Sequence, residues 1–142
     1  YVGLRKANAV GVIDMAKLEL MKTIETGPDA NRLYLNPGNS RYGLFANEAG
    51  KSDIVSIIDT QLDVKVKDIW TGLGPHNVAF DPDGKFAVIS TKKENVATLV
   101  DTGSADPNDW DVITTDLDSG IQNNGVRWVP SPAALKKALA QN

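Results

Sequence analysis

The chain has 142 residues, with 15 Lys and Arg, 18 Asp and Glu, one His and no Cys, and its formal net charge is −3. This length and a hydrophobic content of 42% indicate a single globular domain, and the acidic balance argues against a nucleic-acid-binding surface. Without Cys the chain forms no disulfide or iron–sulfur cluster, and with one His it cannot build a multi-histidine metal site alone.

The sequence begins within a strand-like run, and no initiator Met or signal peptide precedes it, so we expect a mature terminus or a piece of a longer protein. One segment then occurs three times, at residues 8–14, 53–59 and 95–101. Each copy ends in Asp, and these aspartates are 45 and 42 residues apart. A second element repeats with a spacing of 45 and has a degenerate third copy: residues 32–37, 77–82 and 125–130. Two elements with one period indicate a repeated structural unit.

Each unit contains short segments rich in Val, Ile and aromatic residues, which is typical of strands. The run Pro82-Asp83-Gly84-Lys85 predicts a tight turn with Gly at a positive φ, and Pro37-Gly38-Asn39-Ser40 is expected to do the same in the earlier unit. Four antiparallel strands in 40–50 residues is about the size of one β-propeller blade. The sequence therefore predicts an all-β fold of propeller blades.

At this point the repeats resemble the YVTN-type β-propeller family. Residues 53–101 carry nearly all of the repeat, residues 8–47 carry it with losses, and residues 102–130 carry a degenerate copy. The resemblance implies that the Val-Ala-Phe segment is the innermost strand of a blade, lining the central channel. The next three segments of each unit are then the second, third and outer strands.

Laid on this chain, that order predicts a partial propeller over residues 1–130 and a C-terminal tail helix over residues 131–142. The partial first blade, residues 1–25, has its second, third and outer strands at residues 1–4, 8–14 and 19–25. Two complete blades follow over residues 31–70 and 77–115, with strands at residues 31–36, 41–47, 53–59, 64–70, 77–81, 85–91, 95–101 and 110–115. Residues 125–129 are a lone inner strand.

Three blades' worth of strands should not close a ring, since propellers use about 4–8 blades. Open flanks would expose apolar faces and unpaired strand edges. We expect the chain to be the C-terminal part of a longer propeller, or to pair with further copies. A homodimer would have six blades, with the lone inner strand of one chain joining the partial blade of the other. An open repeat or a different fold are the remaining alternatives.

One segment carries candidate chemistry: Gly72-Leu73-Gly74-Pro75-His76-Asn77. It leads into an inner strand at the rim of the channel, and imidazole is a common ligand of transition metals and haem. The segment resembles the copper-ligand segment of nitrous oxide reductase propellers and of thiocyanate-oxidising copper propellers. The resemblance implies that His76 is a metal- and cofactor-binding residue and that Asn77 contacts the cofactor. The alternative is that His76 is a loop residue that caps the strand.

In those families several blades each provide a His, whereas here Asn31 or its neighbour and Asn124 hold the matching positions. The chain alone therefore cannot form a multi-copper cluster. Other features favour structural roles. The aspartates Asp14, Asp59 and Asp101 are expected to cap turns, the acidic run at residues 106–111 to be a solvated loop rather than a calcium site, and three tryptophans to pack between blades: Trp70, Trp110 and Trp128.

Two functions follow from these observations. The first is a ligand- or partner-binding propeller scaffold, and the alternative is a fragment or subunit of a periplasmic redox enzyme. In that case copper, haem or a quinone would bind at the channel mouth of the complete assembly. The resemblance implies a periplasmic or secreted protein. The expected partner is the remainder of a longer propeller or another chain, with no nucleic acid and, because no apolar run reaches about 20 residues, no membrane span. The sequence does not decide whether the chain is catalytic.

Overall fold

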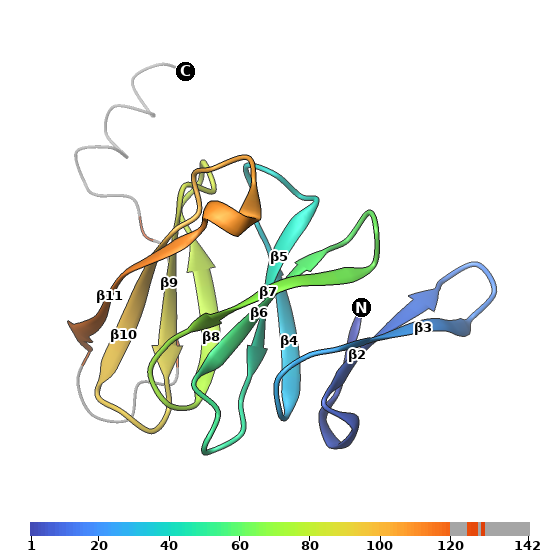
Figure 1. Ribbon diagram of the computed structural model, residues 1–142, viewed down its shortest axis with the longest axis horizontal. Coiled ribbons are helices and arrows are strands. Elements are labelled where there is room, and N and C mark those ends of the chain that lie inside the picture. Colours follow the sequence, from blue (N-terminus) through green and yellow to red (C-terminus); the bar gives the residue numbers. More distant parts are fainter. Residues whose placement is uncertain (120–124, 128, 130–142) are drawn as a thin grey trace.

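The computed structural model describes residues 1–119, 125–127 and 129, and in this part of the chain eleven strands form three antiparallel sheets (Figure 1). The first sheet has the order β1-β2-β3, with β1 (Val2–Leu4), β2 (Ala9–Asp14) and β3 (Glu19–Glu25). The second contains β4 (Ala30–Leu35), β5 (Tyr42–Asn47), β6 (Ile54–Asp59) and β7 (Val64–Trp70). The third contains β8 (Pro75–Phe80), β9 (Phe86–Thr91), β10 (Val96–Asp101) and β11 (Asp111–Asp118).

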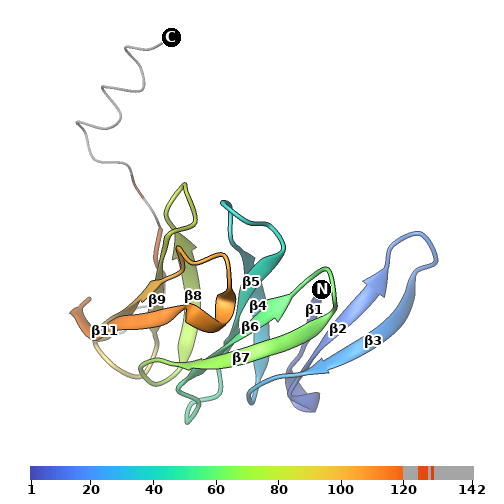
Figure 2. The same cartoon turned by 45° about the horizontal axis from the view of Figure 1, so that its top comes forward.

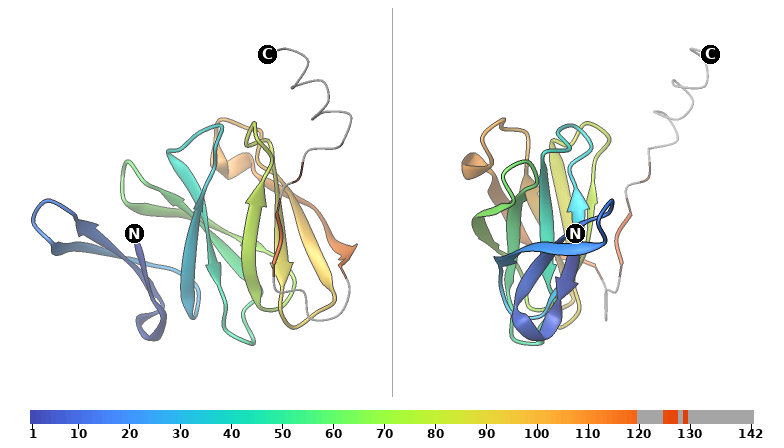
Figure 3. Two further views of the ribbon diagram at one scale, coloured as in Figure 1. Left: turned by 180° about the vertical axis from the view of Figure 1, so that it is seen from behind. Right: turned by 90° about the vertical axis from the view of Figure 1, so that its right-hand side faces the viewer.

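The three sheets stand face to face as a fan, in chain order from the blue hairpin to the orange strand (Figure 2). Within each sheet the strands pair in sequence order, and β4 and β8, the first strands of two consecutive sheets, contact one another. Seen along the stack, the sheets lie one behind another (Figure 3). These are consecutive β-propeller blades in an open arc, so the predicted all-β fold and strand order are confirmed.

The arc is held together by two apolar cores, one on each side of the second sheet. Between the second and third sheets, Ile57 packs in a cluster with Ile89, Val100 and Trp110. Between the first and second sheets, Ile58 packs in a cluster with Val10, Ile24, Phe45 and Ala30. Because successive residues of a strand point to opposite faces, the largely apolar strand β6 supplies both cores, through Ile57 on one face and Ile58 on the other.

The repeated aspartates close the turns that follow the third strands, as the sequence predicts. The Oδ1 atom of Asp14 accepts hydrogen bonds from the backbone of Ala16 and Lys17 at 2.8 and 3.1 Å. Asp59 accepts from Gln61 and Leu62 at 2.9 and 3.1 Å in the same way, and Asp101 accepts from Gly103 N at 2.9 Å. These side chains therefore serve the backbone of their own turns.

The two Pro-containing turns differ from each other, contrary to expectation. Gly84 has a φ of +69°, which confirms the predicted conformation, but Gly38 has no positive φ. At Gly38 the requirement is space, since an added Cβ would overlap the carbonyl oxygen of Asp83 in the neighbouring blade. Asn36 joins the two turns, because its side chain accepts from Gly38 N at 2.8 Å and donates to Gly84 O at 2.8 Å.

The acidic run after β10 folds as a capped turn. Residues 107–109 form a short 3-10 helix, η2 (Pro107–Asp109), and the side chain of Asp106 accepts from Asn108 N at 2.9 Å. Trp110 follows this helix and is 1% exposed, packing edge-on against Tyr42 with ring centroids 6.0 Å apart. Its predicted position between blades is confirmed, although it precedes β11 rather than lying on it.

The prediction for Trp70 is wrong, because this side chain is 68% exposed. It is the last residue of β7, the outermost strand of its sheet, and among the described residues no neighbouring sheet extends far enough to cover it. Trp128 lies outside the described residues.

The end of the chain departs from the expected pattern where it is described. Residues 125–127 and 129, expected to belong to a lone inner strand, adopt no strand conformation. The predicted tail helix at residues 131–142 lies outside the described residues. In the part of the chain that is described, no helix is long and apolar enough to cross a membrane.

The two tryptophans of known position give a matched test of the fold. Trp110→Ala removes a fully buried ring, and we expect it to lower the free energy of unfolding by about 3–5 kcal/mol. Trp70→Ala should change it by only about 0.5 kcal/mol, as exposed substitutions usually do. Denaturant titration of both variants measures this difference, and equal losses would contradict the packing described above.

Asp59 gives a second test, through pH. Burial works to raise the pKa of its carboxyl group, but hydrogen bonds from Arg41 (2.6 and 2.9 Å) and from the backbone of Gln61 and Leu62 hold that pKa below its ordinary value. A carboxyl whose pKa is lower folded than unfolded stabilises the fold above the unfolded pKa of about 3.9, and this contribution is lost as pH falls.

We therefore expect Asp59→Asn to destabilise the protein at neutral pH and to flatten the loss of stability below about pH 4. The free energy of unfolding should be measured against pH for both proteins. Asp83→Asn, in an exposed turn, is the control, and parallel curves for wild type and Asp59→Asn would exclude this role.

Candidate functional site

The candidate site lies where loops from all three blades meet, at the end drawn lowest in Figure 1. The contributing segments are the η1 turn (Arg5–Ala7) after β1, the loops after β5 and β9, and the segments that lead into β4 and β8. Each inner strand begins here, so these loops form the rim of the channel in a propeller. His76, the second residue of β8, lies at this rim as the sequence predicts.

Glu48, the first residue after β5, is the centre of this rim. Its side chain is 10% exposed and forms an ion pair with Lys92, while Asn31 donates a hydrogen bond to its Oε2 atom. Nε2 of His76 is 3.6 Å from Oε1, and a guanidinium nitrogen of Arg5 is 3.9 Å from Oε2. One carboxylate thus joins residues from three blades.

The imidazole of His76 is oriented from its other side. The Tyr34 hydroxyl donates to Oδ1 of Asn77 at 2.5 Å, which fixes the amide so that its nitrogen faces Nδ1 of His76 at 3.0 Å. An amide nitrogen can only donate, so Nδ1 accepts and the ring proton lies on Nε2, toward Glu48. The His76 side chain is 14% exposed, and burial raises the pKa of the Tyr34 hydroxyl that begins this chain of hydrogen bonds.

A second ion pair extends the network to the first blade. A guanidinium nitrogen of Arg5 lies 2.6 Å from Asp29, and this hydrogen bond holds the pKa of the Asp29 carboxyl below its ordinary value. Asn8 accepts from the backbone N–H of Asp29 at 3.1 Å. The segment leading into β4 is therefore tied to the turn after β1.

The side chains around His76 provide few of the ligands that a copper or haem iron needs. In the described part of the chain, no group of three or more His, Asp or Glu side chains is placed to hold a metal ion. His76 could provide one imidazole ligand, and the other ligands of a copper or haem iron would have to come from outside these residues. Asn31, which the repeat matches to His76, contacts the same carboxylate, and Asn124 lies outside the described residues.

Sequence reasoning found His76 and Asn77 but missed the charged residues around them. A signal was present, because Arg5, Glu48 and Lys92 each stand immediately after the second strand of their blades. Their charges alternate as positive, negative and positive around the rim. Equivalent loop positions of consecutive blades are neighbours in a propeller, so alternating signs would have predicted pairing between blades.

Comparisons with known proteins support the fold. No protein-family model and no curated protein sequence matches the chain. Among solved structures, hydrazine synthase from Kuenenia stuttgartiensis is similar, with 25% identity and a TM-score of 0.64 over 80% of this chain and 33% of its own. The dihydro-heme d1 dehydrogenase NirN, solved in complex with DHE, has 18% identity and a TM-score of 0.69 over 91% of this chain and 27% of its own.

A 6-phosphogluconolactonase-like protein from Bacteroides fragilis is also similar, with 21% identity and a TM-score of 0.62 over 82% of this chain and 35% of its own. The chain therefore spans about a third of the length of the structures it matches. It has the fold of a partial β-propeller, which needs further parts to complete a ring.

Glu48 allows a direct test of this network. We expect Glu48→Gln to lower the free energy of unfolding by about 1–3 kcal/mol, because it leaves Lys92 without its counter-charge. A double-mutant cycle with Lys92→Gln should give a coupling energy of about 0.5–3 kcal/mol. Glu25→Gln, on an exposed position of β3, is the matched control. A coupling energy near zero would show that the pair does not join the blades.

Proposed function

We propose that the chain is a section of a YVTN-type β-propeller that acts as a ligand- or partner-binding scaffold, with the rim around His76 as its binding surface. The observation that carries this proposal is the network centred on Glu48, which joins three blades at the channel mouth. A polar surface whose side chains are already fixed loses little conformational entropy on binding, which favours affinity. His76 and Asn77 are the proposed ligand contacts.

The proposal includes the partner that completes the ring, either the remainder of a longer propeller or another chain, including a second copy. The outward face of the first sheet supports it, because Ile13 lies opposite Leu20 there and both are exposed. The outward face of the third sheet likewise exposes Phe86 and Leu117. Apolar faces of this kind are covered in the interfaces between adjacent blades. A periplasmic or secreted location is part of the same proposal.

The alternative is a fragment or subunit of a periplasmic redox propeller enzyme. It is favoured by two of the similar structures, a hydrazine synthase and a dehydrogenase. In such an enzyme His76 would be one ligand of copper or haem iron, or one contact of a quinone, in the complete assembly. The Asn77 amide would then set the orientation of the imidazole, as hydrogen-bond partners of metal ligands commonly do.

Metal content and the visible absorption spectrum of the intact protein distinguish the two functions. The scaffold proposal expects neither copper nor iron at stoichiometric levels, and no more than weak binding of added Cu²⁺. The redox alternative expects a bound metal or chromophore, and His76→Ala should reduce its retention at least tenfold. That outcome would replace the scaffold proposal.

The controls for this experiment follow from the contacts of His76. Gln61 lies in an exposed turn after β6, outside the rim, so Gln61→Ala should leave metal content unchanged. Asn77→Ala is not a silent control, because Asn77 holds Nδ1 of His76. His76→Ala itself should cost about 1 kcal/mol of stability, so folding is checked by thermal unfolding before metal content is compared.

A further inference from the structure

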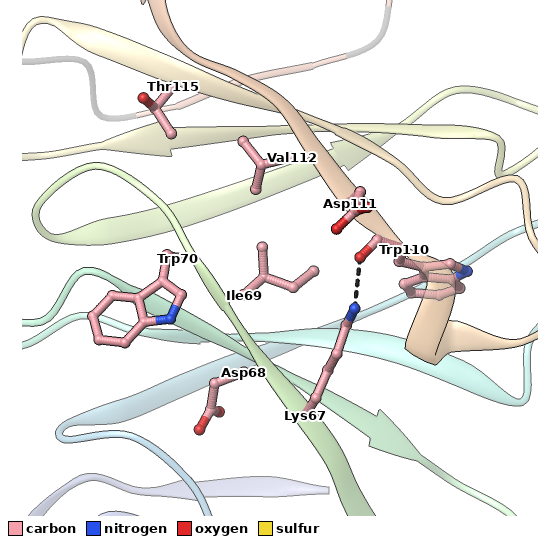
Figure 4. A pocket seen from close by; sticks show the side chains of 8 residues that line it. All are labelled: Lys67, Asp68, Ile69, Trp70, Trp110, Asp111, Val112 and Thr115. Atoms are coloured by element: carbon pink, nitrogen blue, oxygen red, sulfur yellow. Dashed lines mark hydrogen bonds between the residues drawn. The ribbon is translucent and has the colours of Figure 1, made fainter.

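A cavity of about 390 Å³ lies between the outer strands of the second and third blades, β7 and β11 (Figure 4). Its floor is apolar, formed by the adjacent side chains of Ile69 and Val112. Trp70 stands at one end, and Lys67, Asp111 and Trp110 stand at the other (Figure 4). Both blades that form this cavity belong to the described chain, so the site does not depend on completion of the ring.

The two charged side chains at this end of the cavity, Lys67 and Asp111, differ in their hydrogen-bond partners. Lys67 donates to the carbonyl oxygens of Asn108 and Trp110 at 2.6 and 2.8 Å, so its ammonium group is fixed at this end of the cavity. Figure 4 shows the bond to Trp110. The side chain of Asp111 forms no hydrogen bond or ion pair with any residue in the described ranges. Its carboxylate is therefore available to a ligand, next to an apolar floor.

The charged residues that line the cavity are Lys67, Asp68 and Asp111, and the segment that contains Asp111 is acidic. Residues 106–118 contain five Asp and no Lys or Arg. Asp111 also lies directly opposite Asp101 in the β10–β11 ladder, and like charges in that position are unfavourable unless a cation compensates them. An anionic occupant is repelled by this charge, whereas a cation is attracted to it.

Trp70 completes the chemistry of the cavity. Its ring is 68% exposed although it borders a concavity, and indole is the preferred aromatic partner of cationic side chains. Lys and Arg combine an apolar stem with a charged end, which matches a floor of Ile69 and Val112 between an indole and a carboxylate. We propose that this cavity binds a Lys or Arg side chain of a basic peptide segment in a partner protein.

The test uses the intact protein and a synthetic peptide in which Lys alternates with Val. Isothermal titration calorimetry should show saturable binding that weakens as salt is raised, because the contact is partly electrostatic. Asp111→Asn and Trp70→Ala should each weaken binding at least fivefold. Asp116→Asn, which makes the same charge change on the same strand but outside the cavity, should weaken it less than twofold.

Three results would overturn the proposal. These are no saturable binding of the basic peptide, equal losses in Asp111→Asn and Asp116→Asn, or equally tight binding of a Glu-Val peptide or a neutral oligosaccharide. Trp70 is exposed, so its variant should fold, and Asp111→Asn tests the site independently of the indole. The cavity is formed by other residues than the rim, so failure here leaves the proposed function at His76 unaffected.

Discussion

The structure depends on the fact that the middle strands of each blade are apolar on both faces. In β6, Ile57 is buried against the third sheet and Ile58 against the first. Burying such side chains contributes about 1.5–3 kcal/mol each, and a single sheet offers no partner for either face. A blade therefore buries both faces only between two others, which leaves the arc of three sheets incomplete at both flanks.

The polar contacts at the rim fix how the apolar blades are placed relative to one another. Hydrophobic contact alone does not fix how one blade is placed along its neighbour, whereas the carboxylate of Glu48 meets Lys92 on one side and Arg5 on the other. Because Glu48 is nearly enclosed, its charge is costly without these partners. The same constraint positions His76, whose Nε2 faces this carboxylate, so orientation of the imidazole and alignment of the blades have one physical origin.

The sequence predicts well the features that belong to the repeated unit and poorly the features that depend on contacts between blades. The capping role of Asp59 follows from a short local pattern that recurs with a constant period, and the positive φ of Gly84 follows from its own turn sequence. The strand order follows from the resemblance to propeller repeats. The reason for Gly38 could not be found this way, because it depends on the approach of Asp83 from another blade. The exposure of Trp70 also escaped prediction, since periodicity gives the face of a strand but not whether a neighbouring sheet extends far enough to cover it.

The rim around His76 and the cavity beside Trp70 differ in what they imply for function. The rim at His76 is formed by residues of three blades and lies on the channel, so its full surroundings include whatever closes the ring. The cavity at Trp70 lies on the outer side of the arc, between β7 and β11, and its walls come from this chain. A propeller can therefore change an exposed outer side chain such as Trp70 without disturbing the channel, because Ile69 and not Trp70 belongs to the shared core. Trp70 illustrates the point, since Ile69 beside it provides the burial and leaves the indole available for recognition.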